Sequence, residues 1–170
     1  LTRFAMPMTR AGELWVYKPR TIQGPGASRL TVSGNNAVQV FRVTPASPAE
    51  VNFSGLTIHQ GSHPSDPNGN GGIYNAGTAT INIADTTFSD NVAYHGGAVF
   101  NNSTGTINIT GSTFKNNGCA NYGGAVYNNT GTVNVINSTL SNGFGTFGGA
   151  ISNQGAGTIN VTNSTLSHNN

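Results

Sequence analysis

Residues 96–117, GGAVFNNSTGTINITGSTFKNN, decide the fold because the same pattern recurs along the chain. Related copies are GGIYNAGTATINIADTTFSDN (71–91), GGAVYNNTGTVNVINSTLSNG (123–143) and GGAISNQGAGTINVTNSTLSHNN (148–170). Their shared core is a Thr, a β-branched residue, Asn and a second β-branched residue, and it starts at positions 80, 106, 132 and 158, so the spacing is constant. A fixed period of about 26 residues is typical of one supersecondary unit stacked many times.

A second signal extends this array toward the N-terminus. A Thr followed by a large apolar residue begins at positions 31, 57, 87, 113, 139 and 165, which predicts six coils. The interval from 57 to 87 is longer than the others, and it contains HQGSHPSDPNGNGG (59–72). We therefore expect β-helix repeats over residues 25–170 with a loop insertion at 59–72. Residues 1–24 do not fit the repeat and are expected to form an N-terminal cap containing one strand, because the ends of a solenoid need atypical sequence.

Each copy contains three short strand candidates separated by corners rich in Gly and Asn, which suits one turn of a parallel β-helix. The sequence thus predicts an all-β fold, a single-stranded right-handed parallel β-helix (a solenoid) of about six coils. The right hand follows from the general preference for right-handed crossovers between parallel strands.

Alternation along each strand assigns side chains to the inside or the outside of the coil. Ile81 and Ile83 and their copies should point inward, and Asn82 and its copies should point outward. In the first strand of each copy, Ile73 and then Asn75 should both point inward. The copies of Asn75 are Asn101, Asn128 and Asn153. We expect these inward Asn residues to form a ladder whose amides bond along the helix axis and to the backbone of the corners.

Two short motifs resemble those of the polymorphic outer-membrane protein family of chlamydiae and related bacterial proteins. GGA(I/L/V) occurs at 96–99, 123–126 and 148–151, and FxxN occurs at 88–91 and 114–117. The resemblance covers about residues 50–170. It implies a right-handed β-helix displayed at or beyond the cell surface and commonly adhesive or structural, and it brings no catalytic residues with it.

Composition narrows the function classes. Seven Lys and Arg stand against five Asp and Glu, without a basic run interleaved with aromatic residues, so nucleic acid is not an expected partner. No apolar run is long enough for a membrane-spanning helix, which needs about 18 residues. The single cysteine, Cys119, allows no intrachain disulfide. Low charge with abundant Asn, Thr, Ser and Gly favours a secreted or surface protein. The resemblance implies that this surface is bacterial, and we expect a polysaccharide or a host or cell-surface receptor as the partner.

The inserted loop contains a partial calcium motif. Asp66, Asn68 and Asn70, followed by Gly71, match the start of a D-x-N-x-N-G loop, whose alternating oxygen ligands can wrap a hard cation. The twelfth position is Gly77 instead of a bidentate Glu, so a site here would bind calcium weakly. A plain polar turn made of Pro, Asn and Gly is the favoured interpretation, and we expect no required cofactor.

The same loop and the coil after it contain the residues that an enzyme would use. Many β-helix proteins are polysaccharide lyases or glycosidases, which need a base or paired carboxylates. The candidates are His59, His63, Asp66, Asp90 and His95. The chain has only five acids and no G-x-S-x-G or Cys-His signature, which favours a protein without catalysis.

A third hypothesis concerns the third strand of each coil. The outward Thr residues at 31, 57, 87, 113, 139 and 165 form six rungs spaced about 4.8 Å apart. Such arrays resemble those of ice-binding proteins. His59 and Lys115 interrupt the adjacent column, so a structural role for the threonines is favoured.

The chain stops at residue 170 directly after a standard third strand, and an open β-helix edge can pair with another chain, so head-to-tail self-association is also expected. Together these observations predict a secreted or surface-displayed adhesive or structural module. A carbohydrate-active enzyme using the 59–72 loop is the first alternative, and an ice-binding protein is the second.

Overall fold

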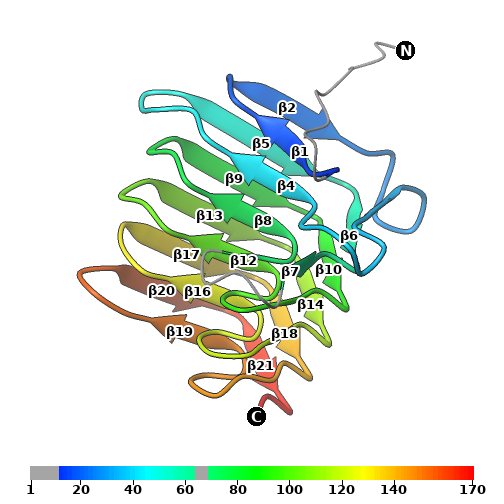
Figure 1. The fold of residues 1–170 in the computed structure, drawn as a ribbon, viewed down its shortest axis with the longest axis vertical. Coiled ribbons are helices and arrows are strands. Elements are labelled where there is room, and N and C mark those ends of the chain that lie inside the picture. Colours follow the sequence, from blue (N-terminus) through cyan, green and yellow to red (C-terminus); the bar gives the residue numbers. More distant parts are fainter. Residues whose placement is uncertain (1–11, 64–68) are drawn as a thin grey trace.

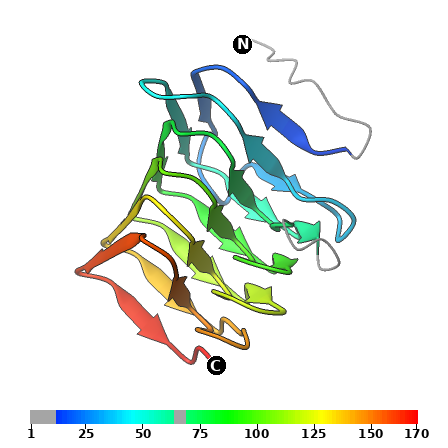
Figure 2. The same cartoon turned by 60° about the vertical axis from the view of Figure 1, so that its left-hand side comes forward.

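The computed structural model describes residues 12–63 and 69–170, in which 21 strands and no helix are found. Successive strands wind around one axis, and each coil lies directly below the one before it from the N-terminus to the C-terminus (Figure 1). Turning the molecule shows the same stack from the side, with the strands of each coil lying on different faces (Figure 2). None of the described residues forms a helix that is long and apolar enough to cross a membrane.

Three six-stranded sheets form the faces of the coil, and every strand pair in them is parallel. The first sheet consists of β1 (Leu14–Val16), β4 (Phe41–Val43), β8 (Ile73–Asn75), β12 (Val99–Asn101), β16 (Val126–Asn128) and β19 (Ile151–Asn153). The second consists of β2 (Arg20–Gln23), β5 (Glu50–Ser54), β9 (Thr80–Ala84), β13 (Thr106–Thr110), β17 (Thr132–Ile136) and β20 (Thr158–Thr162). The third consists of β3 (Thr31–Ser33), β6 (Thr57–His59), β10 (Thr87–Ser89), β14 (Thr113–Lys115), β18 (Thr139–Ser141) and β21 (Thr165–Ser167).

This arrangement confirms the predicted fold class, an all-β parallel solenoid of about six coils with the period that the sequence predicted. A fourth, short sheet was not predicted. It contains β7 (Ser62–His63), β11 (Val92–Ala93) and β15 (Gly118–Cys119), which lie on the corner between the third sheet and the next first-sheet strand. Its strands have only two residues each, too few for an alternation pattern to be visible in the sequence.

The apolar residues at the inward positions of all three sheets form one continuous core, as alternation predicted. Ile81, Ile107 and Val133 stack in register on the second sheet and are fully buried. On the third sheet, the rings of Phe88 and Phe114 stack with their centroids 4.6 Å apart. In the last coil, the inward-pointing Val161 and Leu166 are 46% and 45% exposed, because the described chain places no further coil below them.

The predicted inward Asn ladder is present. Asn75, Asn101 and Asn128 are completely buried, and each Nδ2 donates to the Oδ1 of the next Asn in the column at 2.8–2.9 Å, ending at Asn153. A second ladder, not predicted as one, runs along the outside of the second sheet, where Nδ2 of each Asn donates to Oδ1 of the Asn one coil before it. Its members are Asn52, Asn82, Asn108, Asn134 and Asn160.

The FxxN motif also has a structural explanation. Asn91 and Asn117 lie buried at the corner after the third sheet, and their Nδ2 atoms donate to Ile58 O at 3.1 Å and Phe88 O at 3.0 Å. The residue before each corner Asn has a positive φ, 56° for Asp90 and 54° for Asn116. Asn and Asp tolerate this left-handed conformation better than most residues, so the corner explains the polar pair that ends each repeat.

The segment predicted as an N-terminal cap contributes two strands to the sheets within its described part. β1 pairs with β4 and β2 with β5, in the same register that later coils use, so residues 14–33 form the first coil. Residues 1–11 lie outside the described residues.

The interval from Thr57 to Thr87 is four residues longer than the others, and the strand register shows where these residues lie. Ser62 and His63 pair with Val92 and Ala93, and both first-sheet strands that follow are in register at Ile73 and Val99. From His63 to Ile73 is 10 positions, and from Ala93 to Val99 is 6, so the four additional residues lie between β7 and β8.

Candidate functional site

The structure places four of the five catalytic candidates at the corners around the inserted loop. His59 ends β6, His63 ends β7, Asp90 follows β10 and His95 follows β11. Asp66 lies outside the described residues. Of the four, His59 and Asp90 come together, because β6 and β10 are neighbours in the third sheet.

His59, Ser89 and Asp90 form a polar cluster whose geometry decides what it can do. His59 Nδ1 lies 2.9 Å from Ser89 Oγ and 3.5 Å from Asp90 Oδ2. In a hydrolase triad, the imidazole contacts the nucleophile through one ring nitrogen and the carboxylate through the other. Here both partners lie on Nδ1, so the imidazole does not bridge Ser89 and Asp90 as it bridges the nucleophile and the carboxylate in a triad. The cluster is an arrangement of surface hydrogen bonds.

Asp90 has a structural position as well. It occupies the left-handed corner that Gln60, Asn116 and Asn142 occupy in other coils, and its Oδ1 accepts a hydrogen bond from Asn116 Nδ2 at 3.1 Å. A carboxylate is therefore not needed at this position for the corner to form. His63 is the last residue of β7 and is paired with Ala93.

His95 lies in an aromatic layer on the outside of the first sheet. Its ring is stacked on Tyr122 at 5.4 Å and lies 5.0 Å from the ring of Tyr127 and 4.7 Å from that of Tyr94. Burial in this layer lowers the pKa of His95 below its ordinary value. Its Nδ1 is buried and has no hydrogen-bond partner. The surroundings of His95 are those of a packed aromatic side chain.

This aromatic layer has two columns. Tyr74, Phe100 and Tyr127 project from the outer face of the first sheet, yet they are only 3–5% exposed. The second column consists of His95, Tyr122 and Phe147, each of which immediately precedes a glycine with positive φ. His95 and Tyr122 pack on Phe100 and Tyr127, and Phe147 stacks on Tyr122. Those glycines, Gly96, Gly123 and Gly148, turn the chain so that the preceding ring folds back over the sheet.

This layer was not predicted from the sequence, although an aromatic residue or His before three of the four GG pairs was the available signal. The rings stack on one another along the coil axis. Tyr122 is nearly parallel to His95, Tyr127 and Phe147, with interplanar angles of 16°, 20° and 26°. The rings of His95, Tyr122 and Tyr127 pack on one another, whereas Phe147 at the end of the column is 54% exposed, so the layer mainly serves packing.

The calcium candidates are only partly described. Asp66 and Asn68 lie outside the described residues, and the calcium site stays a prediction. Asn70 is fully buried, and its Nδ2 donates to the carbonyl oxygen of Gly96 while its Oδ1 has no partner. Within residues 12–63 and 69–170, no three His, Cys, Asp or Glu side chains are grouped so that they could hold a metal ion.

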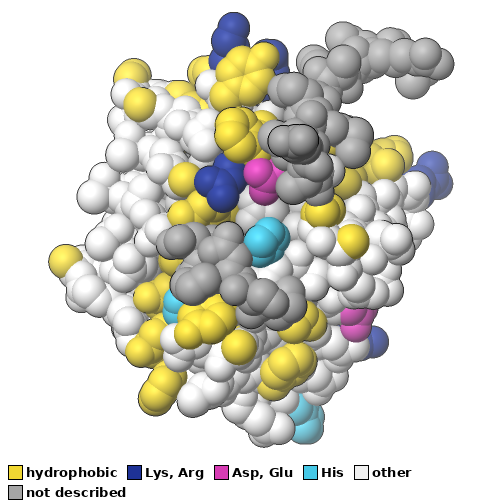
Figure 3. Space-filling view, viewed as in Figure 1, with side chains coloured by type: hydrophobic (Ala, Val, Ile, Leu, Met, Phe, Trp, Pro, Cys, Tyr) yellow, Lys and Arg dark blue, Asp and Glu magenta, His cyan; other side chains and the backbone are white. Residues whose placement is uncertain are grey.

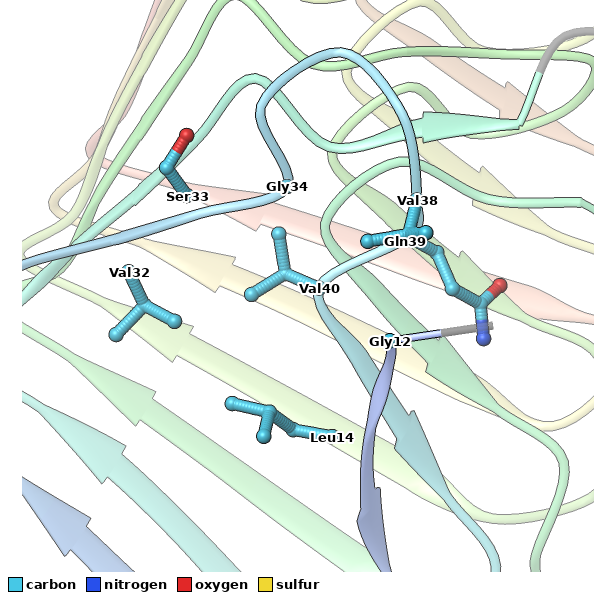
Figure 4. Close-up of a pocket in the computed structure, with 8 residues that line it drawn as sticks. All are labelled: Gly12, Leu14, Val32, Ser33, Gly34, Val38, Gln39 and Val40. Carbon is cyan, nitrogen blue, oxygen red and sulfur yellow. The ribbon is translucent and has the colours of Figure 1, made fainter. Parts of the chain in front are cut away.

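A hollow of about 130 Å³ lies beside the first coil, lined by Gly12, Leu14, Val32, Ser33, Gly34, Val38, Gln39 and Val40 (Figure 4). The side chains of Leu14, Val32 and Val40 approach one another there, so its walls are largely apolar (Figure 4). Ligand pockets usually have volumes of about 300–1,000 Å³. This hollow is too small for a sugar chain and belongs to the N-terminal end of the core.

Aromatic and charged side chains gather on the first two coils. Arg42 lies between two rings, with its guanidinium carbon 5.8 Å from the centroid of Trp15 and 4.9 Å from that of Tyr74. Arg42 Nε is 3.4 Å from Glu13 Oε1, which also accepts a hydrogen bond from the indole of Trp15. Hydrophobic and basic side chains are seen together at the N-terminal end of this face (Figure 3).

The predicted column of Thr residues is confirmed, because the six threonines pair with one another from coil to coil. Thr31, Thr57, Thr87, Thr113, Thr139 and Thr165 are paired in sequence across the third sheet. His59 and Lys115 lie in the adjacent column, at the position of Ser33, Ser89 and Ser141, as expected.

The fold and its stacked corners define a β-solenoid repeat protein. Comparison with protein families then gives the kind of repeat: the Chlamydia polymorphic membrane protein (Chlamydia_PMP) repeat matches residues 85–102 and 111–129. Both matches run from the corner of one coil into the next and contain the FxxN or GGA motifs. Two segments of the chain are thus similar to the repeat of the Chlamydia polymorphic membrane protein. No curated protein and no solved structure matches the chain.

Proposed function

We propose that the chain is a non-catalytic adhesive or structural module of a bacterial protein that is secreted or displayed at the cell surface. The observation that carries this proposal is the continuous in-register stack of all six coils, combined with repeats of a surface-protein family. Such a stack holds its outer faces in a fixed geometry along its whole length, which is what an extended binding or spacer element requires.

The contacts between coils support a rigid element. The buried Asn ladder on the first sheet and the exposed Asn ladder on the second connect every coil from the third to the sixth by side-chain hydrogen bonds of 2.8–2.9 Å. The core and the outer aromatic layer add apolar contacts between the same coils. Each interaction is repeated, so stiffness is distributed along the axis.

Surface display and adhesion can be tested on intact cells of the source bacterium. Cells are treated with a protease that does not enter them, and the loss of the protein is followed by mass spectrometry against a cytoplasmic control protein. Beads coated with the purified chain are then tested for attachment to polysaccharide films and to cell monolayers. Protection from the protease until the cells are lysed would contradict surface display.

An activity assay separates the module from the enzyme. The chain is incubated with pectin, alginate and similar polymers, and reducing ends and unsaturated products are measured. The proposal predicts no turnover. Turnover that disappears in the Asp90→Ala variant would contradict it and would favour the carbohydrate-active alternative.

A further inference from the structure

The few charges of the chain are distributed unevenly along the solenoid axis. Residues 1–42 contain six of the seven Lys and Arg and one of the five acids, giving a formal charge of +5. Residues 43–170 contain one Lys and four acids, giving −3. Within the described residues, 12–42 contain Lys18, Arg20, Arg29 and Arg42 against Glu13, a formal charge of +3, and they form the first coil and enter the second at one end of the stack (Figure 1). In the described part of this end, Lys18, Arg20 and Arg29 are exposed.

The same end carries exposed aromatic rings. Trp15 is 38% and Tyr17 is 48% exposed; Phe144 and Phe147 near the other end of the molecule are exposed to a similar extent, but no Lys or Arg lies in residues 116–170. They are two residues apart on one extended segment, so both side chains lie on the outer face at a spacing of about 6.6 Å. Lys18 Nζ lies 5.6 Å from the ring centroid of Tyr17. This combination distinguishes the first coil from every later one.

Arg42 adds a cation that the second coil holds in place. It is paired in register with Trp15, directly below it on the first sheet. Its guanidinium stacks between Trp15 and Tyr74, and its ion pair to Glu13 uses Nε. A guanidinium bound through Nε still has its two terminal nitrogens, which match the two oxygens of a carboxylate. The side chain is oriented before any ligand arrives.

From this arrangement we infer that the outer face of the first two coils, formed by Trp15, Tyr17, Lys18 and Arg42, binds an acidic polysaccharide such as a uronic acid polymer. Pyranose rings present apolar C–H faces that pack on aromatic rings, and their carboxylates pair with Arg and Lys. The inference rests on the proposed function, because it names the ligand class of an adhesive module. The positive end of the molecule attracts a polyanion, and the rings give contacts that a simple salt would not make.

The shape of this face favours a polysaccharide over a membrane. Lipid binding through aromatic residues requires an apolar face that enters the bilayer by about 5–10 Å. Trp15 lies on β1, whose other side faces the core through Leu14 and Val16 and whose edge is paired to β4. The exposed rings lie beside Lys18 and the Arg42–Glu13 ion pair, so this face is charged as well as aromatic, which suits an extended anionic polymer better than the apolar interior of a bilayer.

The test measures the affinity of the full chain for polygalacturonate by isothermal titration calorimetry, with neutral dextran in parallel. Lys18→Gln is compared with Lys115→Gln, which removes the same charge from an exposed position on β14, three coils away. We expect Lys18→Gln to weaken binding roughly two- to fivefold, and Lys115→Gln to leave it unchanged. Tyr17→Ala should weaken binding at least as much as Lys18→Gln, at unchanged net charge.

Each result supports or overturns the inference. Binding that weakens with added salt, is absent for dextran and depends on Lys18 and Tyr17 supports it. Equal losses in Lys18→Gln and Lys115→Gln would show attraction by net charge alone and would overturn it. Stronger binding to phosphatidylcholine vesicles containing one quarter phosphatidylglycerol, or to duplex DNA, would also overturn it. If the chain binds no acidic polymer while the intact cells display it and the coated beads attach to other surfaces, the inference fails and the proposed function stands.

Discussion

Asn101 offers the sharpest test of how the solenoid is held together. It is the last residue of β12 and is fully buried. Its Nδ2 donates to Asn128 Oδ1 at 2.9 Å, to Thr130 O at 2.9 Å and to Gly105 O at 3.1 Å. Its Oδ1 accepts from Asn75 Nδ2 at 2.8 Å. One amide therefore satisfies polar groups of three consecutive coils.

Asn101→Leu keeps the approximate size of the side chain and removes all of these bonds. The two backbone carbonyls and Asn128 Oδ1 then lose this donor inside the protein, where water does not replace it. A buried polar group without a partner costs about 1–3 kcal/mol. Gly105 O keeps the hydrogen bond from Thr132 N, and Asn75 Nδ2 keeps the one to Ser103 Oγ. Two acceptors, Asn128 Oδ1 and Thr130 O, lose their donor, so we expect the free energy of unfolding to fall by about 2–6 kcal/mol.

The matched control is Asn108→Leu in the same coil. Asn108 belongs to the outer ladder, with bonds of 2.9 Å to Asn82 and 2.8 Å to Asn134, and it is partly exposed. Water can solvate the groups that this substitution releases, so the expected loss is below about 1 kcal/mol.

Both variants are unfolded in urea and followed by circular dichroism, and their midpoints and slopes are compared with those of the unchanged chain. A difference of about 1 kcal/mol or more between the two variants supports the reasoning. Equal losses would refute it, because the burial of Asn101 would then have no energetic consequence.

Three further predictions concern single positions. Gly123→Ala should lower the melting temperature markedly, because Gly123 has φ of +67° and an added Cβ would lie 2.3 Å from Val126 O; a melting temperature unchanged in calorimetry would be inconsistent with the described corner. The pKa of His95 in the folded chain is below the unfolded value of 6.5. The stability that neutral His95 contributes is therefore fully present above pH 6.5 and is lost as the pH falls through the folded pKa. His95→Phe should reduce the loss in melting temperature between pH 8 and pH 5, and an identical pH profile in both proteins would count against this. Burial raises the pKa of Cys119 to about 11, so iodoacetamide should react slowly with the native chain at pH 8 and quickly in urea; equal rates, measured by mass spectrometry, would show that the thiol is accessible.

Most of the fold was predictable because the repeat samples the same environment six times. A single TINI segment fits many structures, but four copies of this pattern at a constant spacing fit a stacked coil far better than other folds. The inward direction of Ile81 and Asn75 followed from the alternation of strands, and both are buried in the structure. The inward Asn ladder was predictable for the same reason.

The candidate site was predictable only as a set of residue types. His59 and Asp90 are 31 positions apart in the sequence, and the register between β6 and β10 brings them together. Ser89 and Asp90 both contact Nδ1 of His59. This arrangement depends on side-chain rotamers at a corner, and the spacing of residues in the sequence does not reveal them. The prediction of catalytic candidates therefore could not include the geometry that distinguishes a triad from a hydrogen-bonded cluster.

The sequence by itself determined the period, the number of coils, the inward and outward faces and the membership of the Asn and Thr columns. These properties are local or repeated, so alternation and spacing are sufficient to read them. Only the tertiary structure decided that His95, Tyr122 and Phe147 fold over the first sheet, and that Arg42 lies between Trp15 and Tyr74. The physical reason is that these contacts join different coils through corner conformations and side-chain directions, which depend on how the coils stack and not on any one segment of the chain.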